Sequence, residues 1–301
     1  MLPIVTHPQY SFDFPGKHRF PMEKFKLLNQ YLTEKNIVTP SNTFRPGKAR
    51  LDFLQLAHCP DYLHRFINNL QSKQEVRRMG LPWSEGLLNR TLISPNGTFL
   101  TALLALDHGI ACHLAGGTHH ANYDFASGFC ILNDLALSAR AIILQGKVNK
   151  VLIVDCDVHQ GDGTASILQN DDDIFTFSMH CEKNFPVRKA HSNLDIGLDV
   201  GLKDQAYLDT LEHHLLSVIR SFKPDFIFYD AGVDIYEHDP LGLLNISLKG
   251  IEDRDRLVLD ICKQFNIPVA TVIGGGYDDD RMALAKRHAL VVEAAQDIYK
   301  I

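Results

Sequence analysis

Four short stretches of the sequence place aspartate, histidine, glycine and tyrosine at spacings that suit metal-assisted hydrolysis. In each stretch the polar residues directly follow an apolar run of the kind that forms a buried strand. The carboxyl ends of parallel strands meet at one edge of a sheet, where open α/β folds bind their ligands. The four stretches are Ala115-Gly116-Gly117-Thr118-His119-His120, Asp155-Cys156-Asp157-Val158-His159-Gln160-Gly161-Asp162-Gly163, Asp230-Ala231-Gly232-Val233-Asp234 and Gly274-Gly275-Gly276-Tyr277.

The second and third stretches offer ligands for a metal ion. Asp157 and His159 are two positions apart at a strand end, so their side chains point to the same face. With Asp234 they give three protein ligands and leave a fourth position for water, as in a catalytic zinc site. An isolated D-x-H is equally a strand end with a capping carboxylate. The additional strand-end carboxylates and the histidine pair favour the metal.

His119 and His120 are candidates for acid–base catalysis. A neutral imidazole beside a metal-bound water suits a general base, because zinc lowers the pKa of that water to about 7. Each ring needs a partner on its other nitrogen, and Asp155 and Asp162 are the spare carboxylates on the next strand. The alternative is a structural histidine pair.

Tyr277 follows three glycines at the same edge. Its hydroxyl can donate a hydrogen bond to a carbonyl oxygen as negative charge develops there, which is the electrophilic half of amide hydrolysis. A glycine-rich strand end can instead cradle a phosphate. No Walker pattern or G-x-G-x-x-G accompanies these glycines, so phosphate binding is disfavoured.

A two-manganese ureohydrolase site is a further alternative. It needs an aspartate two residues beyond the histidine, where this chain has Gly161. It also needs a D-x-D pair, whereas Asp230 and Asp234 are four positions apart. The pattern therefore favours a single metal ion.

Strands that alternate with helices must position these residues. Apolar, β-branched runs predict strands at 109–114, 151–154, 174–177, 226–229 and 269–273. Helical spacing predicts helices at 23–35, 61–70, 98–107, 132–144, 205–222, 251–265 and 282–299. The order favours an open, doubly wound, mainly parallel α/β sheet with helices on both faces, and no linker divides residues 1–301. We expect a single domain, a helix-ending Gly146, and a long surface loop at 71–90.

Composition excludes several classes of function. The chain has 30 Lys and Arg against 36 Asp and Glu, a formal net charge of −6, and no long basic run, so direct nucleic-acid binding is not expected. No stretch is apolar enough to predict a membrane span, and the amino terminus does not resemble a signal peptide. The six cysteines form no C-x-x-C pair, which favours reduced thiols and a cytoplasmic protein.

The motifs of this chain resemble those of the zinc-dependent histone deacetylases and their bacterial deacetylase-like relatives, and those of the class IV branch most of all. The resemblance extends from about His18 to Tyr277 in the family's order. Besides the four stretches, it rests on Gly117-Thr118-His119-His120-Ala121, Ser127-Gly128-Phe129-Cys130, Leu132-Asn133-Asp134 and Asp239-Pro240-Leu241-Gly242. It implies the arginase-like open α/β sheet and a deacetylase, or more generally a deacylase.

The resemblance also implies a role for each site residue. His120 with Asp162 would be the general base and then the general acid, His119 with Asp155 would act electrostatically, and Tyr277 would hold the carbonyl oxygen. The implied zinc ligands are Asp157, His159 and Asp234. The implied walls of the acyl-lysine channel are Gly128, Phe129, Phe185 and Leu241. The implied potassium site lies at Asp155, Asp157, His159, Ser178 and Met179.

The chain departs from its relatives around the pocket mouth. It has His18-Arg19-Phe20-Pro21 where many relatives carry His-Pro, and no counterpart between Gln71 and Trp83 of the acidic residue that grips peptide backbone. Leu241 replaces the carboxylate of polyamine-specific relatives, which favours an acylated lysine of a protein or peptide over an acetylpolyamine. A small acyl amide and a non-catalytic acyl-lysine binding module are the alternatives, and the oligomeric state is not assigned.

Overall fold

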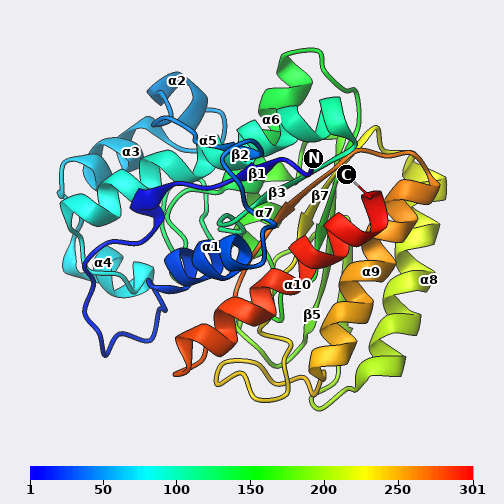
Figure 1. The fold of residues 1–301 in the computed structure, drawn as a ribbon. Helices are drawn as coiled ribbons and strands as arrows, with labels where there is room; N and C mark the ends of the chain where they lie inside the picture. The colour runs from blue at the N-terminus through cyan, green and yellow to red at the C-terminus, as the bar shows by residue number, and fades with distance from the viewer. Residues whose placement is uncertain (301) are drawn as a thin grey trace.

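The computed structural model describes residues 1–300, in which eight strands form one parallel sheet (Figure 1). The strand order is β2-β1-β3-β8-β7-β4-β5-β6, and every strand pair is parallel. The strands are β1 (Ile4–Val5), β2 (Thr43–Phe44), β3 (Ile110–His113), β4 (Val151–Asp155), β5 (Ile174–Cys181), β6 (Leu194–Leu198), β7 (Phe226–Asp230) and β8 (Val269–Val272).

The predicted strands are confirmed, and their burial explains why the sequence revealed them. Every residue of β3, β4, β7 and β8 is buried, as expected for strands that are covered on both faces. The sequence did not reveal β1, β2 and β6. Two of these are only two residues long, and β6 is largely half-buried at the edge of the sheet, so none carries a continuous apolar run.

Helices cover both faces of the sheet (Figure 1). On one face α1, α10, α9 and α8 pack side by side, and on the other α5, α6 and α7 form the covering layer. The helices are α1 (Lys24–Glu34), α2 (Leu51–Leu54), α3 (Pro60–Ile67), α4 (Lys73–Met79), α5 (Glu85–His108), α6 (Asp134–Leu144), α7 (Asp162–Leu168), α8 (Asp204–Phe222), α9 (Leu248–Gln264) and α10 (Arg281–Tyr299), with a short 3-10 turn at Pro8–Tyr10. The predicted fold class is therefore correct, and Gly146 has the expected left-handed backbone, at a φ of 64°.

The predicted surface loop at 71–90 is wrong. Ser72 and Glu75 form a reciprocal capping box that starts α4, and Gly80 ends it with a left-handed backbone. Met79 and Leu81 are buried, and the first turns of the long helix α5 follow. The arginines and glycines of this segment interrupt its apolar periodicity. The residues that identify α4 in the sequence are therefore its capping residues.

The four motif stretches follow β3, β4, β7 and β8, which are neighbours at the centre of the sheet. In register, Asp155 lies opposite Asp230, and Asp230 lies opposite Val272. The polar residues beyond these strands therefore meet at one sheet edge, as predicted. The six cysteines are free, and no helix within residues 1–300 is long and apolar enough to cross a membrane.

Candidate functional site

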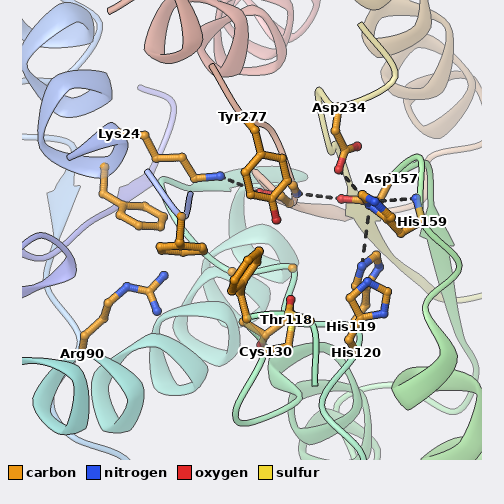
Figure 2. Close-up of a pocket in the computed structure, with 18 residues that line it drawn as sticks. Lys24, Arg90, Thr118, His119, His120, Cys130, Asp157, His159, Asp234 and Tyr277 are labelled. Carbon is orange, nitrogen blue, oxygen red and sulfur yellow. Dashed lines mark hydrogen bonds and ion pairs between the residues drawn. The ribbon is translucent and has the colours of Figure 1, made fainter. Parts of the chain in front are cut away.

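Asp157, His159 and Asp234 form one buried group at the sheet edge. One potential ligand atom of each lies within 4.8 Å of the others. His159 Nδ1 is 3.0 Å from Asp157 Oδ1 and 3.1 Å from Asp234 Oδ2. Figure 2 shows the three side chains gathered on one side of the pocket, beside the rings of His119 and His120.

Backbone groups hold the two carboxylates of this group in place. The Val158 N–H donates to Asp234 Oδ1 at 2.9 Å, and the Gly275 N–H donates to Asp157 Oδ2 at 2.7 Å. A Cβ atom on Gly275 would collide with both carboxylates, so only glycine permits this approach. The loops that follow β4, β7 and β8 therefore hold the two carboxylates in fixed positions.

The charges of this group fit a cation. Burial alone would lower the pKa of His159, but its hydrogen bonds to Asp157 and Asp234 outweigh burial and raise the pKa to about 10. These two buried carboxylates therefore favour positive charge between them, at the position where a metal ion would balance them. Because metal ligands must be deprotonated, a dication would displace a proton from His159. The donor set, two carboxylates and one imidazole, suits zinc with an open position for water or substrate.

His119 and His120 each donate to a carboxylate through Nδ1. His119 Nδ1 is 2.7 Å from Asp155 Oδ2, and His120 Nδ1 is 2.6 Å from Asp162 Oδ1. These are the pairings that the resemblance implied. His119 Nε2 lies 3.9 Å from Asp157 Oδ1, whereas Nε2 of His120 is left for other partners, and both residues line the pocket.

A glycine turn and a buried aspartate position the histidine pair. Gly116 and Gly117 have φ values of 84° and 80°, in the left-handed region that favours glycine. The backbone N–H groups of Gly117 and Thr118 then donate to Asp134, at 3.1 and 2.8 Å. The carboxylate of Asp134, at the start of α6, therefore fixes the turn from which the two rings project.

The two histidines have opposite pKa shifts. Burial would lower the pKa of His119, but the Asp155 and Asp157 carboxylates raise it well above its usual value. Burial lowers the pKa of His120 to about 4, assisted by positive charge on His119, in spite of Asp162. His120 is therefore the neutral ring with a free nitrogen, and His119 is the ring that favours positive charge.

The hydroxyl of Tyr277 is a hydrogen-bond donor. Burial, followed by the nearby Asp234 carboxylate, raises the pKa of Tyr277 well above its usual value, so the phenol keeps its proton. Its backbone N–H donates to Asp239 Oδ2 at 2.7 Å. Asp239 is a positioning residue that the sequence motif contained but that was not predicted as part of the site. In Figure 2 the Tyr277 hydroxyl points into the pocket.

A channel leads from this pocket to the surface. It is lined by the predicted residues Gly128, Phe129, Phe185 and Leu241. The ring of Phe185 stands edge-on to that of His120, with centroids 4.9 Å apart. Gly128 has a φ of 53°, and a Cβ there would lie 2.6 Å from the His120 ring. A side chain at this position would obstruct the channel.

The floor of the pocket contains two buried cations that sequence reasoning missed, Lys24 and Arg90 (Figure 2). Lys24 Nζ donates to the Gly274 carbonyl oxygen at 3.0 Å. Burial lowers the pKa of Lys24 to about 8 and that of Arg90 to about 10. Lys24 shares the i, i+4 face of α1 with the buried residues Leu28 and Leu32, and this placement was the signal available in the sequence.

Arg254 on α9 is a second missed residue. Its guanidinium is fully buried and donates to backbone carbonyls of both ligand-bearing loops: Gly232 at 2.5 Å, Ala231 at 3.2 Å and Cys156 at 3.3 Å. It also pairs with Asp255 at 2.9 Å. Arg254 therefore ties the loops after β4 and β7 together from behind.

Asp230 makes a second buried group with His119 and Asp155, within the same 4.8 Å limit. Within residues 1–300 neither carboxyl oxygen of Asp230 has a hydrogen-bond partner. Burial, followed by repulsion from Asp155, raises its pKa well above the usual value, so its neutral form is favoured. Of the residues predicted for potassium, Asp155 pairs in register with Ser178 on β5, next to Met179.

Comparison with known proteins identifies the class of the chain. A family model described as the histone deacetylase domain matches residues 18–293. The chain belongs to the histone deacetylase family, and it is a hydrolase that acts on amides, a deacetylase.

Three relatives show how far the similarity extends. A protein of Picosynechococcus is 50% identical over 297 residues, which cover 99% of both chains. Histone deacetylase 2 of Arabidopsis thaliana is 32% identical over 290 residues, covering 91% of this chain and 74% of the relative. The acetoin utilization protein AcuC of Staphylococcus aureus is 30% identical over 298 residues, covering 91% and 76%.

Proposed function

We propose that the chain is a zinc-dependent deacylase that removes acyl groups from Nε-acyl-lysine of proteins or peptides. The observation that carries this proposal is the convergence on one pocket of a three-ligand group, a neutral His120 and a protonated Tyr277. A channel lined by Phe129 and Phe185 leads to these groups and suits an extended alkyl amine.

In this proposal the metal is held by Asp157, His159 and Asp234. A zinc ion bound there would supply Lewis-acid polarisation of the substrate carbonyl and a more acidic water. The chain contributes a preorganised set of ligands, because backbone N–H groups and Arg254 fix the loops before any ion binds. Its negative charge also favours a cation at this position.

His120 acts as general base and then as general acid. Its Nδ1 donates to Asp162, which fixes the tautomer and leaves Nε2 to accept a proton from water. The same Nε2 later gives that proton to the leaving amine of lysine. His119, held by Asp155, stabilises negative charge in the transition state, since its own environment favours the protonated ring.

Tyr277 stabilises the carbonyl oxygen of the scissile amide. Its hydroxyl stays protonated and donates to that oxygen, and the donation strengthens as negative charge develops there. The Asp239 carboxylate and Gly276, at a φ of 152°, set the backbone that presents the ring.

The wall of the channel favours acyl-lysine over an acetylpolyamine. Leu241 lies at the mouth, and no carboxylate lines this part of the channel within the residues described. A polycation would therefore find no electrostatic partner there. The rest of the proposal follows the sequence: residues 1–301 act as one catalytic domain in the cytoplasm, and a potassium ion lies near Asp155, Asp157, His159, Ser178 and Met179.

The test combines metal analysis with an acyl-chain panel. Purified protein should bind one zinc ion and hydrolyse acetyl-, propionyl- or longer acyl-lysine peptides. Tyr277→Phe should keep the metal and lose about 10²- to 10³-fold in kcat, the cost of removing one oxyanion donor. Equal inertness of wild type and Tyr277→Phe on every peptide would contradict the proposal. Faster hydrolysis of acetylpolyamines would indicate a small-molecule enzyme, and tight binding without turnover a binding module.

A further inference from the structure

Three arginines surround the mouth of the acyl channel. Arg19, Arg77 and Arg78 line it together with Phe185 and Leu241, and all three are exposed. Other arginines form the ion pairs with carboxylates within residues 1–300, namely Arg50, Arg65, Arg140, Arg254, Arg256 and Arg287. No carboxylate lines the mouth among the described residues. The three guanidinium groups are therefore available to a ligand.

Two of these arginines are built onto the wall of the channel. Arg77 and Arg78 form the last turn of α4, where the buried Met79 anchors the helix. The Met79 carbonyl oxygen accepts from the backbone N–H of Phe129 at 3.0 Å. The Arg78 guanidinium also lies 4.0 Å from the centroid of the Phe125 ring. Because α4 is bonded directly to the channel wall, both side chains start from a fixed position beside the entrance.

Arg19 is held near the end of α4 by the adjacent residue, His18. His18 Nδ1 accepts from the Phe20 N–H at 3.0 Å, so Nε2 carries the proton and donates to the Gly80 carbonyl oxygen at 3.0 Å. Gly80 is the residue that ends α4. The segment that carries Arg19 is thus held against the end of the helix that carries Arg77 and Arg78.

The mouth of the channel carries only basic charged side chains, whereas its inner end carries carboxylates together with the buried cations Lys24 and Arg90. The chain as a whole has a net charge of −6, and Asp157 and Asp234 lie at the inner end of the channel. When the acyl carbonyl of a substrate reaches that end, the amine side of the substrate lies at the mouth. For an acyl-lysine peptide, this side includes the peptide backbone and the residues next to the lysine. The groups that meet the arginines therefore belong to the substrate beyond its side-chain amine.

We propose that Arg19, Arg77 and Arg78, the arginine rim, select substrates that carry carboxylates on the amine side of the scissile amide. An acyl-lysine between acidic residues of a peptide is such a substrate. The inference rests on the deacylase function proposed above and adds the substrate class. Guanidinium groups match carboxylates in shape and charge. A single exposed pair contributes little, but three arginines around one entrance add their fields within a Debye length of about 10 Å at 0.1 M salt.

The experiment compares three acetyl-lysine peptides of equal length, flanked by Glu, Gln or Lys on both sides. Wild type should show a kcat/KM for the Glu peptide about tenfold above that for the Gln peptide, with the Lys peptide lowest, and mostly through KM. The preference should shrink at 0.5 M salt. Free Nε-acetyl-lysine against its α-amide tests whether one α-carboxylate is sufficient or whether flanking acidic residues are needed.

Variants assign the preference to the rim. Arg77→Gln with Arg78→Gln should bring the Glu-to-Gln ratio close to one, Arg19→Gln should lower it in part, and Arg77→Lys with Arg78→Lys should retain most of it. Arg220→Gln makes the same change at an exposed position on α8 that lines no part of the channel, and it should leave the ratio unchanged. Unfolding temperatures identify any variant that is merely unfolded.

The outcomes separate this inference from the function on which it rests. If wild type cleaves the three peptides at equal rates at low salt, or if Arg77→Gln with Arg78→Gln keeps the ratio, the rim is not a selectivity element, although the deacylase stands. If no peptide and no free acyl-lysine is cleaved by the zinc-loaded protein, the deacylase function itself fails.

Discussion

His113 and His120 are buried to a similar degree, at 0% and 4% exposure, but their partners differ. His113, at the end of β3, lies between two hydroxyl groups: Tyr10 at 2.7 Å from Nε2 and Thr98 at 3.0 Å from Nδ1. His120 has a carboxylate on Nδ1 and the open pocket on the side of Nε2. Burial therefore does not distinguish the proposed catalytic histidine from the structural one, whereas a free nitrogen opposite a carboxylate does.

The tautomer of His113 follows from its neighbours. The single hydroxyl proton of Thr98 goes to Asp134 Oδ2 at 2.5 Å, so Thr98 must accept from the Nδ1–H of His113. Nε2 then accepts from the Tyr10 hydroxyl. Both nitrogens are used, and burial lowers the pKa of His113 to about 3. The ring cannot take up or release a proton without breaking this network.

The same substitution in both rings gives the largest expected contrast. His120→Gln should lower kcat/KM by about 10²- to 10⁴-fold, because it removes the group that moves the proton. The unfolding free energy should change far less, since the substituted side chain can still donate to Asp162. Peptide hydrolysis at saturating zinc and urea unfolding measure the two quantities. An active His120→Gln enzyme would remove this residue from the mechanism.

His113→Gln should have the opposite profile. It leaves the Tyr10 hydroxyl or Thr98 without a well-placed partner in a buried network, which costs about 1–3 kcal/mol of unfolding free energy. The kcat of the folded protein should fall much less than that of His120→Gln, when both are normalised to the folded fraction. A loss of kcat equal to that of His120→Gln would break the comparison between the two rings.

The sequence predicted which residues meet at this sheet edge, but it did not predict helix α4 at the mouth of the channel. Strand ends that follow apolar runs could be identified because parallel strands are buried on both faces, and a common edge then brings Asp157, His159 and Asp234 together. By contrast, α4 is short and only partly amphipathic. Its capping residues, rather than an apolar pattern, are what could have predicted it. Contacts such as that of Arg254 with three carbonyls depend on tertiary packing, which no local pattern encodes.

The comparison also predicts a pH dependence of stability. His58, bonded to the Asn122 carbonyl, and His113 have pKa values of about 4 and about 3 when folded, both lowered first by burial. Unfolded histidine titrates near 6.5, so below that pH the unfolded chain binds more protons and stability falls as pH falls. Each ring should contribute about 1.4 kcal/mol per pH unit between roughly 6 and 4.

Urea unfolding of wild type and His113→Gln at pH 7, 6 and 5 isolates this contribution. The variant starts from a lower stability at pH 7 but should lose less of it on acidification, so the two curves should converge. Parallel curves would show that the His113 ring is not the group being titrated.

The smallest effect is expected at His213, an exposed histidine on α8 whose ring lies beside that of His214. Like the catalytic candidates it is one of two adjacent histidines, but no carboxylate is bonded to it within residues 1–300 and it lines no part of the channel. His213→Ala should therefore change the unfolding free energy by less than about 0.5 kcal/mol, and kcat/KM by less than about twofold. A larger loss of activity would mean that adjacency of two histidines matters in itself. The expected result leaves the carboxylate partners on Nδ1 as the feature that separates His119 and His120 from His213 and His214.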